Sequence, residues 1–427
     1  MNSKRSHDPH RVLDKEKFVP AGMNKEPMAW EQIRKELNRY QEDDPTWESG
    51  KVFTSIYPPN PSISASRELY RISREAAGQF LHTNLLHAAA WRSVDRFASD
   101  ILVWLADLFQ APGTYGSATL GGSEGIFLAM KASRDRARAE RGIETPEMVI
   151  PSTAYPTFLR AAHYMDIKVR RIPVGADYRA DVSRMRDAMN SNTVLVVGSA
   201  SCLPYGVVDP IEALGAMSAE RGVDFHVDAS IGGLQLPYWR KMGKRVPAFD
   251  FSVPGVTSIH ADLHKFGYAP PGISVILHRS SEHHQFQEWV MEDWIMNVYR
   301  NRNLLGTHSG GAIAAAWAIM RYLGEDGFLK AAGHLWEATE RMVSGINKIP
   351  GLYVIGQPDT STFAIASKEL DVRALAERVR ELGWFPSPRI HTSPPAIHVT
   401  LSPIHAGSVD ECLSDLDKAC HSLRSNT

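Results

Sequence analysis

The stretch from Glu147 to Leu277 alternates short apolar runs with amphipathic segments, and this alternation constrains the fold more than any other feature of the chain. Strands are predicted at residues 148–151, 168–172, 193–199, 224–228 and 274–277, and helices at 157–164, 179–189 and 210–221. Strands that alternate with helices favour a mainly parallel sheet with helices on both of its faces. The sequence therefore predicts an α/β fold.

The pattern changes toward the C-terminus. Helices at 312–323 and 329–348 lead to predicted strands at 352–355, 363–366 and 397–401 and to helices at 372–382 and 409–423. This order predicts a smaller α+β domain. We divide the chain into an N-terminal segment (1–80), a large domain (81–325) and a small C-terminal domain (326–427). The charged, irregular stretch Met1–Pro27 is expected to be mobile or to lie over a partner subunit.

A glycine-rich stretch precedes the alternating region. Residues 116–125 read Gly-Ser-Ala-Thr-Leu-Gly-Gly-Ser-Glu-Gly and indicate a loop that opens the amphipathic segment Ile126–Arg138. Backbone N–H groups at the N-terminus of a helix suit an anion such as a phosphate. A dinucleotide site is the competing interpretation, but the stretch lacks Gly-x-Gly-x-x-Gly spacing after a strand.

Two further residues complete a set that points to one cofactor. Asp228 ends the apolar run that begins at Phe225, and Lys265 follows His264 in a polar turn between two strand-like runs. A lysine amine can form a Schiff base with an aldehyde. An aspartate at the carboxyl end of a strand can hold a cationic ring nitrogen. A glycine-rich loop, an aspartate and a lysine in this order indicate a pyridoxal 5'-phosphate (PLP) site rather than a solvated surface lysine.

These motifs resemble those of the group II pyridoxal-phosphate decarboxylase superfamily and, within it, those of the sphingosine-1-phosphate lyases. The similarity runs from about Trp47 into the C-terminal region. It rests on Gly50–Val52, Asn84–His87, Thr119–Glu124, Gly206–Pro210, His226–Ala229, Asp250–Val253 and Gly255–Lys265. The resemblance implies the aspartate aminotransferase-like PLP fold type I, with a mainly parallel seven-stranded sheet between helices and a smaller C-terminal domain.

The resemblance also implies site residues and an assembly. Lys265 would carry the cofactor, Asp228 would pair with its ring nitrogen, and Tyr155 and His87 would complete the catalytic set. His87 and Ser199 also have a purely structural interpretation. The cofactor-binding set would be Gly122, Ser123, Tyr155, Ser199, Asp228, His264, Lys265 and, from the other subunit of a homodimer with shared active sites, Gly310.

Three positions depart from the pattern of the family. Tyr155 stands where the family usually has a histidine, Pro271 where the lyases usually have a lysine, and His308-Ser309 where they usually have Arg-Pro. The last two changes remove positive charge from a pocket for a phosphate or a β-hydroxyl group. Three functions therefore stay open. They are retro-aldol cleavage of a β-hydroxy amine to an aldehyde and a smaller amine, decarboxylation of an amino acid with or without oxidative deamination, and PLP binding without catalysis.

Composition limits the classes of binding partner and the cellular compartment that we expect for this chain. The 427-residue chain has a net charge of −1, which argues against an extended surface for nucleic acid and leaves a small-molecule amine or amino acid as the expected substrate. Cys202, Cys412 and Cys420 lack CxxC spacing, so we expect no disulfide framework, no metal site and a reducing, cytoplasmic compartment. The sequence has no apolar run long enough for a membrane anchor, and we expect a soluble protein.

Overall fold

The computed structural model describes residues 26–42, 44, 49–53, 65–87, 89–389 and 392–425. The chain divides into Met1–Thr46 and Trp47–Thr427. One helix is described in the first part, α1 (Trp30–Gln41), and none of its residues is buried. The prediction for Met1–Pro27 falls almost entirely outside the described residues.

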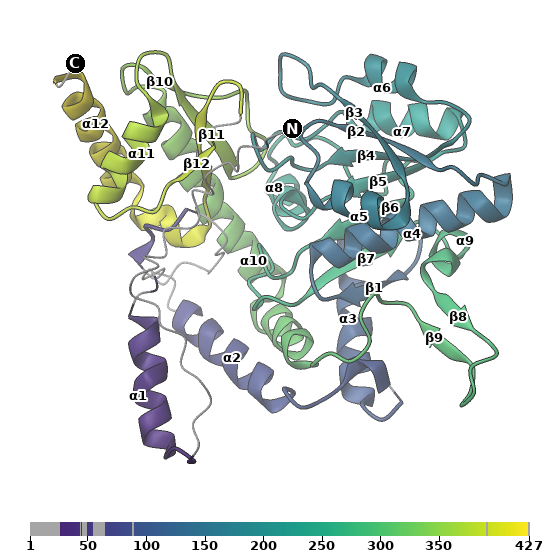
Figure 1. Ribbon diagram of the computed structural model, residues 1–427. Helices are drawn as coiled ribbons and strands as arrows, with labels where there is room; N and C mark the ends of the chain where they lie inside the picture. Colours follow the sequence, from purple (N-terminus) through teal and green to yellow (C-terminus); the bar gives the residue numbers. More distant parts are fainter. Residues whose placement is uncertain are drawn as a thin grey trace. The chain divides into compact units, whose positions relative to one another are not determined.

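A seven-stranded sheet forms the centre of the second part (Figure 1). Its strand order is β1-β7-β6-β5-β4-β2-β3. Strands β2 to β6 run parallel to one another, whereas β7 is antiparallel to both β6 and β1. The strands are β1 (Tyr115–Thr119), β2 (Glu147–Pro151), β3 (Lys168–Ile172), β4 (Thr193–Ser199), β5 (Asp224–Asp228), β6 (Ser258–Ala261) and β7 (Ser274–His278). The predicted mainly parallel sheet is confirmed.

Strand β1 corrects the prediction that the glycine-rich stretch is a loop from Gly116 onward. Residues Tyr115–Thr119 pair with β7 along the edge of the sheet. A Cβ atom on Gly116 would lie 2.1 Å from the carbonyl oxygen of Ile276. The glycine therefore permits close contact between two strands, and only the second half of the stretch leads into a helix.

Helices cover both faces of this sheet because its strands are apolar on both sides. Met148 and Ile150 pack in one cluster with residues of α4 (Gly122–Arg141) and α5 (Thr157–Met165). Val149 belongs to the larger cluster on the opposite face. The other helices described between residues 65 and 287 are α2 (Ala65–Gln79), η2 (Leu85–His87), α3 (Arg92–Leu108), α6 (Val182–Ala188), α7 (Ile211–Glu220), η3 (Gly232–Leu234), α8 (Leu236–Lys241), α9 (Ser281–His284) and η4 (Gln285–Gln287).

A separate antiparallel sheet forms the smaller C-terminal domain, as predicted (Figure 1). Its strand order is β10-β11-β13-β12, and helices α11 and α12 accompany it. The elements are β10 (Leu352–Val354), β11 (Thr362–Ser367), α11 (Val372–Glu381), β12 (Ser387–Arg389), β13 (Ala396–Thr400), η5 (Pro403–Gly407) and α12 (Val409–Ser425).

The long helix α10 (Gly311–Ile346) leads into this domain. The sequence predicts two helices here, and the structure joins them across a kink at Gly324, whose backbone is not helical. Before α10, the hairpin of β8 (Trp289–Met291) and β9 (Tyr299–Asn301) was not predicted. None of the helices in the described ranges is long and apolar enough to cross a membrane.

Candidate active site

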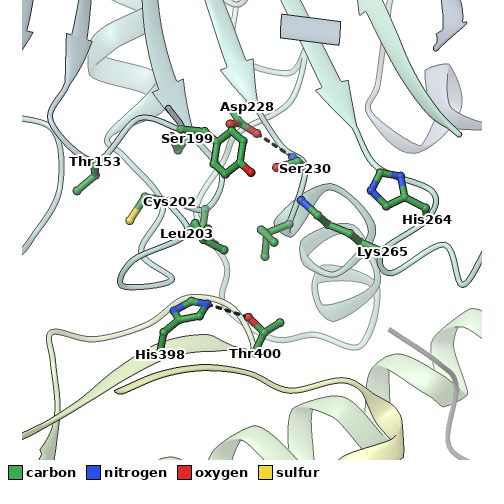
Figure 2. Close-up of a pocket in the computed structure, with 13 residues that line it drawn as sticks. Thr153, Ser199, Cys202, Leu203, Asp228, Ser230, His264, Lys265, His398 and Thr400 are labelled. Atoms are coloured by element: carbon green, nitrogen blue, oxygen red, sulfur yellow. Dashed lines mark hydrogen bonds between the residues drawn. The ribbon is translucent and has the colours of Figure 1, made fainter. Parts of the chain in front are cut away.

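A cavity of about 280 Å³ lies at the carboxyl ends of β2, β4 and β5 (Figure 2). Parallel strands bring their following loops together at this edge, which is where open α/β sheets bind ligands. Strand β13 of the smaller sheet supplies the remaining wall. The lining residues are Thr153, Tyr155, Ser199, Ser201, Cys202, Leu203, Asp228, Ser230, Ile231, His264, Lys265, His398 and Thr400.

Lys265 enters the cavity from the turn after β6. Its Nζ atom lies 2.9 Å from Oδ2 of the buried Asp262, and the hydroxyl of Ser274 donates to Oδ1 of the same carboxylate at 2.5 Å. Burial alone would raise the pKa of Asp262, but the nearby Lys265 and His264 hold it below the ordinary value. Asp262 is therefore a fixed anion that orients the lysine amine at the cavity wall.

Asp228 ends β5 and faces the same cavity (Figure 2). Its Oδ1 atom accepts the Ser230 N–H at 3.1 Å and lies 3.2 Å from Nε2 of His260. Burial would raise the pKa of Asp228, but His260, the hydrogen bond from Ser230 and the charge of Lys265 outweigh it and hold the pKa well below its usual range. Asp228 is a carboxylate at neutral pH, and it is suited to pair with a cationic nitrogen.

The N-terminus of α4 lies beside Asp262 and His264. A Cβ atom on Gly122, the first residue of α4, would lie 2.6 Å from Oδ1 of Asp262. A Cβ atom on the preceding Gly121 would lie 4.0 Å from Cε1 of His264, which lines the cavity. The Ser123 hydroxyl lies 3.3 Å from that of Thr157. The first N–H groups of a helix have no intrahelical partner and attract anions, so this helix start is suited to a phosphate.

Thr153 provides an independent indication that the cavity takes a polar ligand. Its hydroxyl is buried in the cavity wall and has no hydrogen-bond partner among the residues that the structure describes. Leaving a buried hydroxyl unsatisfied costs about 1–3 kcal/mol. Together with Asp228, Lys265 and the start of α4, this hydroxyl fits PLP, which carries a ring nitrogen, an aldehyde, a phenolic oxygen and a phosphate.

Tyr155 and Ser199 also line the cavity, as their predicted roles require. Tyr155 follows β2 and is 43% exposed, so part of this residue is open to a ligand. The backbone N–H of Ser199 donates to Oδ2 of the buried Asp209 at 2.8 Å. Burial raises the pKa of Asp209 to about 6. This contact fixes the end of β4 at the cavity.

Four predicted site residues do not line this cavity: Gly122 and Ser123 at the start of α4, and His87 and Gly310. His87 is exposed at the end of η2, and Gly310 caps α10, where a Cβ atom would lie 2.4 Å from Oγ1 of Thr83. Their loops lie against each other, because the Leu85 N–H donates to the carbonyl of His308 at 3.1 Å. Residues of both loops line a second cavity of about 470 Å³. The predicted role of His87 beside the substrate, and that of Gly310 at the cofactor phosphate of the other subunit, stay predictions.

Several lining residues were missed by the sequence analysis. Thr153, Ser201 and Ser230 each lie two residues after the end of a parallel strand, so the rule that ligands bind at strand ends could have found them. His398 and Thr400 lie on β13 and share one face of it, since they are two residues apart. Their place in the cavity depends on how the two sheets pack, which no local pattern encodes.

Comparisons with known proteins agree on the kind of site. The pyridoxal-dependent decarboxylase conserved domain matches residues 83–363. The chain is 37% identical to the sphingosine-1-phosphate lyase of Arabidopsis thaliana over 401 residues, 92% of this chain and 73% of that protein. It is 31% identical to a probable L-tyrosine/L-aspartate decarboxylase of Methanothermobacter thermautotrophicus, over 87% of this chain and 98% of that protein.

Solved structures of a lyase and a decarboxylase also resemble this chain. The sphingosine-1-phosphate lyase of Burkholderia pseudomallei superposes with a TM-score of 0.90 at 36% identity and covers 97% of this chain and 96% of its own. The glutamate decarboxylase of Lactobacillus brevis has a TM-score of 0.81 at 18% identity, over 96% of this chain and 97% of its own. This second likeness shows the fold alone.

Proposed function

Because the chain belongs to the pyridoxal-dependent decarboxylase family and uses PLP, we propose that it is a carbon–carbon lyase acting on a phosphorylated 2-amino-3-hydroxy compound such as sphingosine 1-phosphate. The products would be an aldehyde and a smaller phosphorylated amine. The observation that carries the proposal is the meeting of Lys265 and Asp228 at one cavity, with the start of α4 against Asp262 and His264 beside it, in a chain similar over 97% of its length to a sphingosine-1-phosphate lyase.

PLP, when bound, supplies a cationic ring that accepts the electron pair left on a substrate carbon when a bond to that carbon breaks. In the proposed reaction the C2–C3 bond breaks, the C3 hydroxyl loses its proton and becomes the carbonyl of the aldehyde, and C2 keeps the electron pair and gains a proton. We assign the proton transfer at C2 to Nζ of Lys265, since Asp262 holds this amine at the cavity wall at 2.9 Å.

The other residues hold the cofactor and the substrate in place. Asp228 keeps the ring nitrogen protonated, because a buried carboxylate stabilises a cation beside it. The N–H groups of Gly122 and Ser123, with His264, bind the phosphate of the cofactor. The face of Tyr155 stacks on the ring.

We also propose an assembly and a compartment. In a homodimer the loops that hold His87 and Gly310 would complete the cavity of the partner, which is supported by the absence of both residues from the lining of the cavity in their own chain. The divisions at residues 80 and 325 would separate the N-terminal segment, the large domain and the small domain. All three cysteines are buried free thiols, which supports the cytoplasm.

Product analysis tests the proposed reaction. The PLP-loaded protein is incubated with sphingosine 1-phosphate and, separately, with L-tyrosine and L-aspartate, and the products are identified by mass spectrometry. We expect a long-chain aldehyde and phosphorylated ethanolamine in equal amounts. Release of carbon dioxide from either amino acid, with no aldehyde from the lipid, would identify the enzyme as a decarboxylase instead.

A further inference from the structure

Four polar side chains form one row on a face of the sheet, and the row ends at Asp228. Its members are Ser258, His226, His260 and Asp228. Strands β5 and β6 are parallel neighbours that pair His226 with Ser258 and Asp228 with His260. Alternate residues of a strand face the same side, so the four side chains share one face of the sheet. All four are at least 96% buried.

Helices α4 and α5 cover this row. A Cβ atom on Gly125 of α4 would lie 3.0 Å from Cβ of His260, and the ring of Phe158 in α5 meets the edge of His226 at a centroid distance of 6.0 Å. The helix whose N-terminus lies against Asp262 and His264 therefore also closes over His260. Together α4 and α5 cover the row on this face of the sheet.

Hydrogen bonds connect the row from end to end. Nε2 of His260 lies 3.2 Å from Oδ1 of Asp228. Nδ1 of His260 lies 2.9 Å from Nε2 of His226, and Nδ1 of His226 lies 2.8 Å from the Ser258 hydroxyl. The two imidazole rings are 7° from parallel, with centroids 5.1 Å apart. Each of the four ring nitrogens thus has a partner within the row.

The chemistry of these groups fixes the direction of every bond. A carboxylate only accepts, so Nε2–H of His260 donates to Asp228. When both rings are neutral, each has one N–H, so Nδ1 of His260 accepts from Nε2–H of His226, and Nδ1 of His226 accepts from the Ser258 hydroxyl. Burial, and then the nearby His260, lower the pKa of His226 well below its ordinary value, in agreement with a neutral ring at His226. All three bonds point toward Asp228.

We propose that Ser258, His226 and His260 are positioning residues that hold the negative charge on Asp228 and thereby keep the shared proton on the ring nitrogen of the bound cofactor. This inference rests on the proposed role of the cavity as a PLP site. A buried carboxylate beside a protonated ring nitrogen can take that proton, and the ring then loses its capacity to accept electrons. Hydrogen bonds donated to the carboxylate favour its charged form and oppose the transfer.

The geometry also assigns the two oxygens of Asp228. Both the Ser230 N–H and His260 reach Oδ1. Oδ2 is therefore the oxygen we assign to the ring nitrogen. The row acts on the cofactor only through the charge of this one carboxylate, and a substitution at His260 should change cofactor binding without removing any group that touches the cofactor.

Substitutions at His260 test the proposed effect of the row on Asp228. The two measurements are the PLP affinity and the visible absorbance of the bound cofactor, and neither requires turnover. His260→Leu removes the donor, whereas His260→Gln places an amide N–H near the former Nε2. We expect His260→Leu to weaken PLP binding about tenfold and to change the absorbance spectrum, and His260→Gln to stay within about threefold of wild type. His278→Leu is the matched control, because His278 is a buried histidine on the adjacent β7 that pairs with Gln287 instead.

The outcomes distinguish the role of the row from the proposed PLP site. Failure of the wild-type protein to bind PLP would overturn both the proposed function and the proposed role of the row. Normal PLP binding by wild type, with equal affinities for His260→Leu and His278→Leu, would overturn only the proposed role of the row. If His260→Leu does not fold, Ser258→Ala at the far end of the row should weaken binding about threefold, and wild-type affinity and spectrum in that variant would refute the inference.

Discussion

Substitution of Gly122 by alanine tests how closely α4 must approach the site. The added Cβ atom would lie 2.6 Å from Oδ1, 3.0 Å from Oδ2 and 3.2 Å from Cγ of Asp262. The shortest of these distances is about 1 Å inside the roughly 3.5 Å at which non-bonded atoms attract. Asp262 cannot move away without lengthening its contact of 2.9 Å with Lys265 or that of 2.5 Å with Ser274. The start of α4 or the lysine must therefore shift.

We expect this shift to cost about 1–3 kcal/mol of stability, as overpacking of a buried site does, and to weaken PLP binding at least tenfold. Absorbance titration with PLP measures the affinity, and thermal unfolding without PLP measures the stability. Gly78→Ala is the matched control, because an added Cβ atom there meets nothing within 4 Å and helix α2 should gain about 0.5–1 kcal/mol. Wild-type PLP affinity in Gly122→Ala would refute the assignment of this helix start to the phosphate.

Three further predictions concern the cavity. Lys265→Ala should reduce turnover at least a thousandfold while circular dichroism stays unchanged, and full activity would rule out this lysine as the attachment point. Tyr155→Phe should keep PLP affinity within about threefold because the ring face remains, whereas Tyr155→His should change the rate or the product ratio; unchanged rate and product would show that this position does not direct the chemistry. The pKa of Asp209 is raised to about 6 from an ordinary 3.8, so its contribution to stability is complete below about pH 4 and is lost as the pH rises through 6. Chemical unfolding of Asp209→Asn at pH 4 to 7 should show less of this loss than wild type, and identical pH profiles would contradict the buried, neutral form.

The sequence predicted the parts of the site that depend on strand order. Asp228 and Lys265 follow apolar runs of the central sheet, and parallel strands bring such residues to one edge. Strand β1 was not predicted because its Gly116, which permits close contact with β7, is also a residue typical of loops.

Other features depend on long-range pairing. The row from Ser258 to Asp228 exists because β5 and β6 align His226 with Ser258, which is 32 residues away in the sequence. The sequence of neither strand alone specifies this register. His398 reaches the cavity only through the packing of the smaller sheet. Both follow from tertiary structure rather than from local periodicity.

Reductive trapping of the cofactor tests the central claim most directly. The PLP-loaded protein is treated with borohydride, which fixes the cofactor to its lysine as a stable secondary amine, and is then digested and sequenced by mass spectrometry. The account predicts one modified site, Lys265, and loss of the label when substrate amine is in excess before reduction. A label on another lysine, or no label on a protein that binds PLP, would contradict the claim that this cavity is the active site.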